Sequence, residues 1–367
     1  MPFQAKNDSI NLPMNYQQYF LPYTKEIDKF LASFFQQKIK EAEKIDPIVA
    51  DFWEKIKNFI EGGKRVRGSL VKLGYECFKK SDGKKLLPVS AALEITQGAI
   101  LIHDDIIDQG DLRHNHPTVH KQYEAYHQKN YQKGSSKQYG ESMAIVAGIV
   151  GYYGALDLIN EIKFLAELKL KVINHLASFM LKTGYGEGLD VDLSYRAKMA
   201  ENDVLKIHTY KTSYYTLVGP LKIGGILAGA GENQLKKFED YGLPVGIAYQ
   251  LQDDILGIFG EEKELGKLIG NDIKEGKNTI LFTQAIKMGT PKQRQRLNTL
   301  WGKKDISLEE IKEAREIIKE TSSLEYSQKM ALQLAAKGKK AVSKITKDKN
   351  IQEVFSSLAD FVISRSK

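Results

Sequence analysis

Apolar residues recur at helical spacing through most of this chain. Ile27, Leu31 and Phe34 share one face of a helix predicted over 23–37. The same spacing predicts further helices over 49–60, 89–108, 143–159, 164–181, 203–231, 234–259, 279–288, 292–301, 307–320, 324–341 and 351–363. No segment shows the alternation typical of strands, and no linker is long enough to separate two domains. The pattern therefore predicts an all-α protein in which residues 1–367 form a single domain of about ten or more helices.

Polar or glycine-rich stretches interrupt this pattern. Residues 1–16 are polar and are predicted to be a loosely ordered tail, whereas 110–117 must form a turn. The polar stretch 124–141 is predicted to be a flexible loop. The glycines between Gly184 and Gly188 are predicted to end the helix that precedes them.

Three carboxylates stand at the end of the apolar stretch 89–108. In a helix, Asp104 and Asp108 lie one turn apart on the same face, while Asp105 is rotated away. Carboxylate oxygens suit Mg²⁺, which usually takes only one or two of them from protein and leaves positions for substrate phosphates. An acidic helix end is more often simply solvated, but this helix is too apolar to lie on the surface. Because a buried acid needs a partner, the pair predicts a metal site.

A second acidic pair, Asp253 and Asp254, ends the apolar stretch 234–259 in the same way. Gly257 stands at the position that corresponds to Asp108. Two such helices facing each other would form a cage of carboxylates with room for metal ions and a polyanion. Basic residues accompany the two pairs along the chain, at Lys64, Arg65, Arg67, Arg113, Lys211, Lys267, Lys274 and Lys277.

These segments, in this order, resemble those of the trans-prenyltransferases, the polyprenyl diphosphate synthases of the isoprenoid synthase fold. The resemblance runs from GGKRVR at Gly62 to the C-terminal residues near Arg365. It implies a helical bundle around a central cavity. It also implies Mg²⁺-dependent head-to-tail condensation of isopentenyl diphosphate with an allylic diphosphate, which makes an all-trans prenyl diphosphate.

The resemblance also assigns roles to residues. Asp104 and Asp108 are expected to hold two Mg²⁺ ions, Asp253 helps to hold a third, and Asp105 and Asp254 are supporting contacts. The allylic diphosphate is expected to bind to Arg113, Lys211 and Lys267, with Lys277 in the last motif. Isopentenyl diphosphate, which binds without metal, is assigned to Lys64, Arg67, Gln97 and the position of His114. Thr212 and Gln250 are expected to border the carbocation, where their oxygens stabilise positive charge.

Three positions depart from the family pattern. Gly257 replaces the third aspartate of the second motif, with little expected effect because Asp253 is the metal contact. His114 replaces an arginine, and a neutral imidazole offers one donor where guanidinium offers a charged fork. Ile149 stands where relatives commonly carry aspartate, with no consequence assigned.

Product length is expected to depend on the helix before Asp104. In the family, an aromatic residue five positions before the first aspartate stops growth at short products. That residue is Ala99 here, next to Ile100, and Thr96 and Leu93 lie about one and two turns deeper. We expect a twenty-carbon product, geranylgeranyl diphosphate, with chains of twenty-five carbons or more as the alternative.

The composition narrows the range of partners. The chain carries 54 Lys and Arg against 46 Asp and Glu, and this net charge of +8 admits phosphorylated partners. No nucleic-acid motif is present, so nucleic acid is not predicted as a partner. The single cysteine, Cys77, excludes an intramolecular disulfide and suits a cytoplasmic location. No stretch reaches the roughly 18 consecutive apolar residues of a membrane span.

A homodimer is expected from the family and from the glycines of the stretch 143–159. Gly148, Gly151 and Gly154 would let another helix approach closely. Two other functions remain open. A terpene cyclase would need a different second motif, and a non-catalytic partner subunit of a prenyltransferase would be expected to have lost aspartates that this chain retains.

Overall fold

The computed structural model describes residues 15–81, 83–113, 116–196, 199–260 and 270–365. The helices of these ranges are α1 (Tyr16–Glu43), α2 (Pro47–Ile60), α3 (Val66–Glu76), η1 (Lys84–Leu86), α4 (Leu87–Ile107), α5 (Val119–Asn130), α6 (Ser136–Glu161), α7 (Ala166–Ser194), α8 (Glu201–Ile207), η2 (His208–Val218), α9 (Gly219–Leu227), α10 (Glu232–Phe259), α12 (Asn271–Glu275), α13 (Ile280–Met288), α14 (Pro291–Leu300), α15 (Leu308–Glu320), α16 (Ser323–Ile345) and α17 (Lys349–Ser364). In the described ranges, the strands are β1 (Leu112–Arg113) and β2 (His116–Pro117), which pair antiparallel. The prediction of an all-α fold is confirmed.

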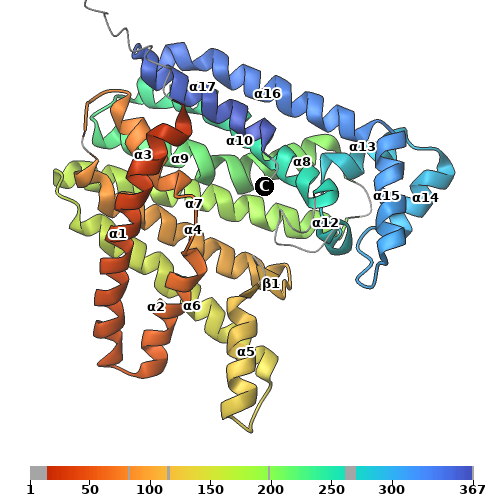
Figure 1. Ribbon diagram of the computed structural model, residues 1–367, viewed down its shortest axis with the longest axis horizontal. Helices are drawn as coiled ribbons and strands as arrows, with labels where there is room; N and C mark the ends of the chain where they lie inside the picture. Colours follow the sequence, from red (N-terminus) through yellow and green to blue (C-terminus); the bar gives the residue numbers. More distant parts are fainter. Residues whose placement is uncertain (1–14, 82, 114–115, 197–198, 261–269, 366–367) are drawn as a thin grey trace, which may run out of the picture.

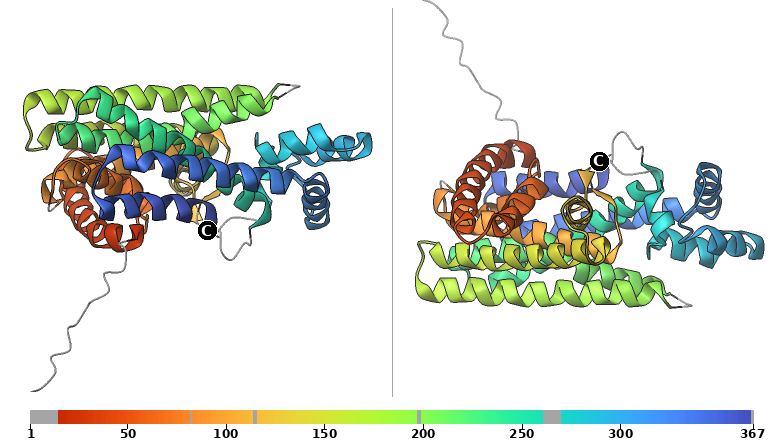
Figure 2. Two further views of the ribbon diagram at one scale, coloured as in Figure 1. Left: turned by 90° about the horizontal axis from the view of Figure 1, so that it is seen from above. Right: turned by 90° about the horizontal axis from the view of Figure 1, so that it is seen from below.

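The two helices that carry the aspartate pairs lie inside the bundle. α4 packs against α1, α2, α3 and α6, and α10 packs against η2, α16 and α17. Figure 1 shows α16 and α17 along one edge of the molecule and α5 projecting from the opposite edge. Both views of Figure 2 place α6 and α7 together along an outer face. The ends of α4 and α10 are therefore held by neighbours on several sides.

Local sequence explains where several helices begin. The Asn15 side chain accepts from the backbone N–H of Gln18, and the Gln18 side chain accepts from the backbone N–H of Asn15, which forms a capping box. Asn15 and Tyr16 thus belong to the start of α1, and the remainder of the predicted tail, 1–14, lies outside the described residues. Asp46 caps α2 ahead of Pro47, which suits the first helical position.

The predicted loop over 124–141 is wrong. α5 runs to Asn130 and α6 begins at Ser136, so that only 131–135 connects them. Tyr123 is fully buried, and the rings of His127, Tyr131 and Tyr139 pack against one another, with centroids 5.1–5.5 Å apart. Tyrosine and histidine carry polar atoms, so a search for the helical spacing of purely apolar residues does not detect the face that they form.

Two apolar clusters form the interior. The larger one includes α1 to α4, α6, α9, α10, α16 and α17, and the smaller one joins the end of α10 to α12, α13, α14 and α15. α10 contributes to both clusters. The prediction of one domain is compatible with this shared helix and stays a prediction.

Two helical segments are long and apolar enough to cross a membrane, Lys84–Ile107 and Ser136–Glu161. Inside the protein, 67% of the most apolar part of the first is buried, against 44% for the second. Core helices of soluble proteins have the same length and composition, so these two segments alone do not indicate a membrane protein.

Candidate functional site

One cavity brings the two aspartate pairs together. Its walls come from the end of α4, the β1 strand, α7, η2, α10 and the segment 275–279. The predicted site residues that line it are Ile100, Asp104, Asp105, Asp108, Arg113, Lys211, Thr212, Gln250, Asp253, Asp254 and Lys277. These predicted residues alone bring five carboxylates and three basic side chains to the cavity.

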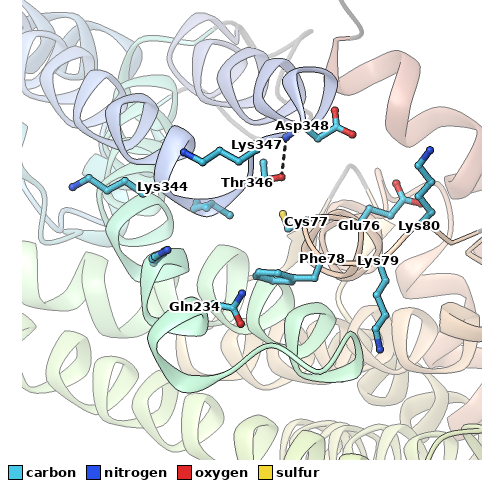
Figure 3. Close-up of a pocket in the computed structure, with 12 residues that line it drawn as sticks. Glu76, Cys77, Phe78, Lys79, Lys80, Gln234, Lys344, Thr346, Lys347 and Asp348 are labelled. Carbon is cyan, nitrogen blue, oxygen red and sulfur yellow. Dashed lines mark hydrogen bonds between the residues drawn. The ribbon is translucent and has the colours of Figure 1, made fainter.

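A second hollow contains none of the predicted site residues. It lies between α3, α10 and the α16–α17 connection (Figure 3). Its basic lining residues are Lys79, Lys80, Lys237, Lys344 and Lys347. Figure 3 shows Lys79 and Lys80 pointing in opposite directions, so the basic groups do not converge on a ligand position. The acidic cavity is the candidate site.

Basic residues hold the first aspartate of the α4 pair. Arg113 Nη2 lies 2.7 Å from Asp105 Oδ1 and 3.4 Å from Asp104 Oδ2. Lys211 Nζ lies 3.3 Å from Asp104 Oδ1. Burial raises the pKa of Asp104, but the charges of Lys211 and Arg113 outweigh it and hold the pKa below its usual value. Asp104 is therefore ionised at neutral pH.

Asp108 lies in a different electrostatic environment, although it is only one turn away. Among the described residues, no hydrogen bond or ion pair reaches its carboxylate. Burial and the neighbouring charge of Asp104 raise its pKa to about 6. At neutral pH this carboxylate is charged but poorly compensated, and such a group favours a cation.

Lys211 also connects the cavity to α7. Its Nζ lies 3.0 Å from Glu187 Oε2 and 2.8 Å from Asp190 Oδ2. Burial lowers the pKa of Lys211, but the carboxylates of Asp104, Asp190 and Glu187 raise it well above its ordinary value. Burial raises the pKa of Glu187 to about 7, with the Lys211 charge acting against it.

Glu187 and Asp190 are not predicted from the sequence, because the glycines around them indicate the end of a helix. That interpretation is wrong, since α7 continues to Ser194. The available signal was the spacing of Thr183, Glu187 and Asp190, which places three polar residues on one face of a helix. All three line the cavity.

A chain of contacts joins η2 to the second aspartate pair. The Thr212 hydroxyl donates to Gln250 Oε1 at 2.8 Å, and Gln250 Nε2 donates to Asp254 Oδ1 at 2.9 Å. His208 Nε2 lies 3.2 Å from the other oxygen, Asp254 Oδ2. Asp253 also lines the cavity, and it pairs with Arg365 at the end of α17.

Lys277 is paired with acids of its own segment. Its Nζ lies 3.5 Å from Asp272 Oδ1 and 3.2 Å from Glu275 Oε2. The Asp272 charge raises the pKa of Lys277 well above its ordinary value, although burial opposes this shift. Asp272 also lies directly against Gly257, where a Cβ would be only 2.0 Å from Asp272 Oδ2. The Asp272 carboxylate thus occupies the space that a side chain at position 257 would fill.

This contact changes the expectation for Gly257→Asp. The resemblance alone suggested little effect, whereas the structure predicts a clash and two adjacent carboxylates. We expect a loss of about 1–3 kcal/mol in the free energy of unfolding, as for overpacked sites. Thermal unfolding of G257D, compared with the double variant G257D/D272G, checks this. The double variant should recover most of the loss, and an unchanged G257D would show that Asp272 moves aside freely.

Other predicted residues lie beside the cavity or beyond it. Arg67 Nη2 donates to the Thr216 hydroxyl at 2.9 Å, and its guanidinium lies 4.3 Å from the ring centre of Tyr215, which lines the cavity. Lys64 lies 5.6 Å from the Phe361 ring, and Gln97 is half-buried on α4. His114 and Lys267 lie outside the described residues.

The four residues assigned to product length lie on α4. Ile100 lines the cavity, whereas Ala99 is fully buried and faces α6. A Cβ on Gly151 of α6 would be 3.0 Å from that of Ala99. Thr96 and Leu93 are also buried, and the Thr96 hydroxyl donates to its own helix at the carbonyl of Ala92.

The donors around the cavity fit magnesium. Asp104, Asp108 and Asp253 offer the hard oxygen ligands that Mg²⁺ prefers. Within the described residues, no three acidic, histidine or cysteine side chains already converge as a metal-binding group. The poorly compensated charge of Asp108 is the observation that best fits a cation here.

Comparisons with known proteins agree on one family. A family model described as polyprenyl synthetase matches residues 52–318. The chain is 34% identical over 306 residues to a short chain isoprenyl diphosphate synthase of Methanocaldococcus jannaschii. The match covers 83% of this chain and 86% of that relative. It is 30% identical over 304 residues to a geranylgeranyl diphosphate synthase of Methanosarcina mazei, with 83% and 86% covered.

The fold of a solved relative matches as well. The structure of a geranylgeranyl pyrophosphate synthase from Corynebacterium glutamicum, complexed with isoprenyl diphosphate and magnesium, superposes with a TM-score of 0.88. The match covers 93% of this chain and 98% of that chain at 28% identity. The similarity therefore includes nearly the whole bundle.

Proposed function

This chain belongs to the polyprenyl synthetase family and is a prenyltransferase, and from that premise we propose how its residues share the condensation of isopentenyl diphosphate with an allylic diphosphate. The C–O bond of the allylic diphosphate breaks and diphosphate leaves with the electron pair. The double bond of isopentenyl diphosphate attacks the allylic cation, and loss of a proton restores an allylic double bond. The observation that carries the proposal is the single cavity lined by both aspartate pairs and by Arg113 and Lys211.

The first task is to neutralise the leaving group. We assign two Mg²⁺ ions to Asp104 and Asp108 and a third to Asp253, with Asp105 and Asp254 in support. When bound, Mg²⁺ neutralises the negative charge that develops on the departing diphosphate. The structural support is the placement of these carboxylates around one cavity. The family is Mg²⁺-dependent, and the number of ions belongs to the proposal.

Fixed cations share that task. Arg113 and Lys211 already contact Asp104, so each can divide its charge between a carboxylate and the allylic diphosphate. Lys277 adds a third cation to the wall. We assign Lys64, Arg67 and Gln97 to the binding of isopentenyl diphosphate. Of these, Arg67 adjoins the cavity, because its guanidinium packs on the Tyr215 ring.

The second task is to stabilise the allylic cation without trapping it. Thr212 and Gln250 line the cavity next to each other, and their oxygens carry partial negative charge. A hydroxyl and an amide oxygen are weak nucleophiles, so they can face a carbocation without forming a bond to it. The buried setting strengthens this electrostatic effect, because little water screens it.

The direct test uses the purified chain with Mg²⁺, radiolabelled isopentenyl diphosphate and allylic primers of five to twenty carbons. We expect all-trans products that depend on both substrates and on the metal. A protein that makes no product with any primer would contradict the proposal. Product that forms only after addition of an active homologue would instead favour the non-catalytic partner subunit.

We propose geranylgeranyl diphosphate as the main product, with longer chains as the alternative. The relatives include geranylgeranyl synthases and also geranylfarnesyl synthases, such as that of Natronomonas pharaonis at 28% identity, so family membership does not decide chain length. The support is that neither Ile100, which lines the cavity, nor the neighbouring Ala99, which faces α6, carries an aromatic side chain.

Bulky substitutions at Ile100 and Ala99 should shorten the product. Ile100→Phe fills the cavity wall directly, and Ala99→Phe must displace α6 at Gly151 to reach the same region. We expect both to shift the products towards fifteen carbons, and Ala99→Phe also to lower the melting temperature. Chromatography of the dephosphorylated products measures the shift. Unaltered distributions in both variants would remove these two positions of α4 from the determinants of chain length.

We also propose a homodimer, although not through the glycines that suggested it. Gly148, Gly151 and Gly154 face inwards, where added Cβ atoms would meet His103, Ala99 and Trp53 of the same chain. The exposed side of α6 instead carries Ile145, Val146, Ile149 and Tyr153, which are 41–69% exposed. Such an apolar face on an outer helix supports a contact between two copies.

Light scattering tests the dimer. The wild-type chain should have about twice the monomer mass of 41.4 kDa at micromolar concentration, and Tyr153→Asp, at the most exposed residue of this face, should shift it towards the monomer. Leu308→Asp, at an exposed apolar residue of α15, is the matched control and should stay dimeric. A wild-type mass near 41.4 kDa would count against the proposal.

A further inference from the structure

His208 has no role in the assignments above, yet it is buried at the edge of the cavity with only 2% of its surface exposed. Its Nε2 lies 3.2 Å from Asp254 Oδ2, and Asp254 itself is 5% exposed. Among the described residues, Asp254 Oδ2 has no hydrogen-bond partner of good geometry, so the imidazole contacts it at ion-pair distance. The imidazole is therefore the partner that holds this side of the buried carboxylate.

The contacts form a ladder between two helical elements. His208 and Thr212 are four residues apart on η2, and Gln250 and Asp254 are four residues apart on α10. Two contacts connect the elements: Thr212 donates to Gln250 at 2.8 Å, and His208 Nε2 lies 3.2 Å from Asp254. Along α10, Gln250 donates to Asp254 at 2.9 Å.

This ladder decides which end of the Gln250 amide faces the cavity. Asp254 Oδ1 accepts from the NH₂ group of Gln250, so the amide nitrogen faces Asp254. The amide oxygen is then directed to Thr212 and the cavity wall. If the carboxylate rotated, the amide could turn and present N–H groups, which repel a carbocation, in place of its oxygen.

We propose that His208 is a positioning residue for the condensation. By fixing the Asp254 carboxylate, it keeps the Gln250 oxygen directed at the place where the allylic cation forms. The inference rests on the proposed function of the cavity, and it gives Asp254 a task beyond supporting a metal ion.

Kinetics of three His208 variants test the inference. His208→Leu keeps the bulk but removes the polar contact, and we expect kcat to fall about tenfold to a hundredfold with little change in KM for either substrate, since loss of a polar contact to a charged group is of this size. His208→Gln can still donate from a similar position and should stay within a few-fold of wild type. His208→Asn is too short to reach Asp254 and should resemble His208→Leu, which provides a second variant if the leucine variant fails to fold.

Two further measurements separate positioning from general damage. If His208 acts through Gln250, then His208→Leu/Gln250→Leu should be no slower than Gln250→Leu alone, whereas losses that multiply would overturn the inference. A crystal structure of His208→Leu or His208→Asn should show a displaced Asp254 carboxylate, and an unmoved carboxylate and amide would also overturn it. A wild-type chain without turnover would contradict the proposed function instead. The crystal structures of the His208 variants would still decide whether His208 positions Asp254 and Gln250.

Discussion

Asp108→Asn should abolish turnover and at the same time stabilise the fold at neutral pH. Its carboxylate is proposed to bind Mg²⁺, and among the described residues it has no ion pair to lose. Because its pKa is raised to about 6, the folded state binds more protons than the unfolded state between roughly pH 4 and 6. Stability therefore falls as the pH rises through this range. Above it, the charged carboxylate lowers the free energy of unfolding by about 1–3 kcal/mol, which the amide removes.

Asp104→Asn is the matched control, since it should also abolish turnover but should destabilise the fold. The pKa of Asp104 is lowered, so its contribution to stability is present above the unfolded value and is lost as the pH falls through the folded value. The amide also leaves Lys211 and Arg113 without one of their carboxylate partners.

Melting temperatures at pH 7.5 should therefore shift in opposite directions for these two variants. The gain in Asp108→Asn should shrink as the pH is lowered towards 4, where wild-type Asp108 is protonated. Near-normal turnover in Asp104→Asn would contradict the metal assignment. Shifts of the same sign would contradict the electrostatic difference between the two aspartates.

The parts of the site that sequence predicted are those set by local geometry. Asp104 and Asp108 share a helix face because of their spacing alone, and the apolar stretch before them predicts the burial of α4. The cations Arg113, Lys211 and Lys277 follow from the order of the family's motifs. The structure places all of these around one cavity.

The parts that sequence missed depend on contacts between distant segments. Arg365, at the end of α17, pairs with Asp253 across more than a hundred residues of chain. His208 is meaningful only beside Asp254 of α10. Glu187 and Asp190 were hidden by glycines, whose effect on a helix depends on what packs against it and not on the glycine alone.

Gly186→Ala is the substitution in α7 from which we expect the largest effect. Gly186 is buried where α7 meets η2, and a Cβ there would lie 2.1 Å from the backbone nitrogen of Lys211 and 2.6 Å from its Cα. Since backbone cannot rotate away as a side chain can, α7 and η2 must separate. We expect a loss of about 1–3 kcal/mol in stability from overpacking. A displacement of about 1 Å in Lys211 and Thr212 should lower kcat by about a hundredfold.

Gly184→Ala provides the control within the same helix. Gly184 is exposed, and no heavy atom lies within 4 Å of the position that its Cβ would take. In a helix interior, alanine is favoured over glycine by about 0.5–1 kcal/mol, so this variant should be slightly more stable and fully active. Thermal unfolding and initial rates, measured side by side, distinguish the two glycines. If Gly186→Ala were as active and stable as Gly184→Ala, then close packing of α7 on η2 would not position Lys211, and the glycines of α7 would have no role in the site.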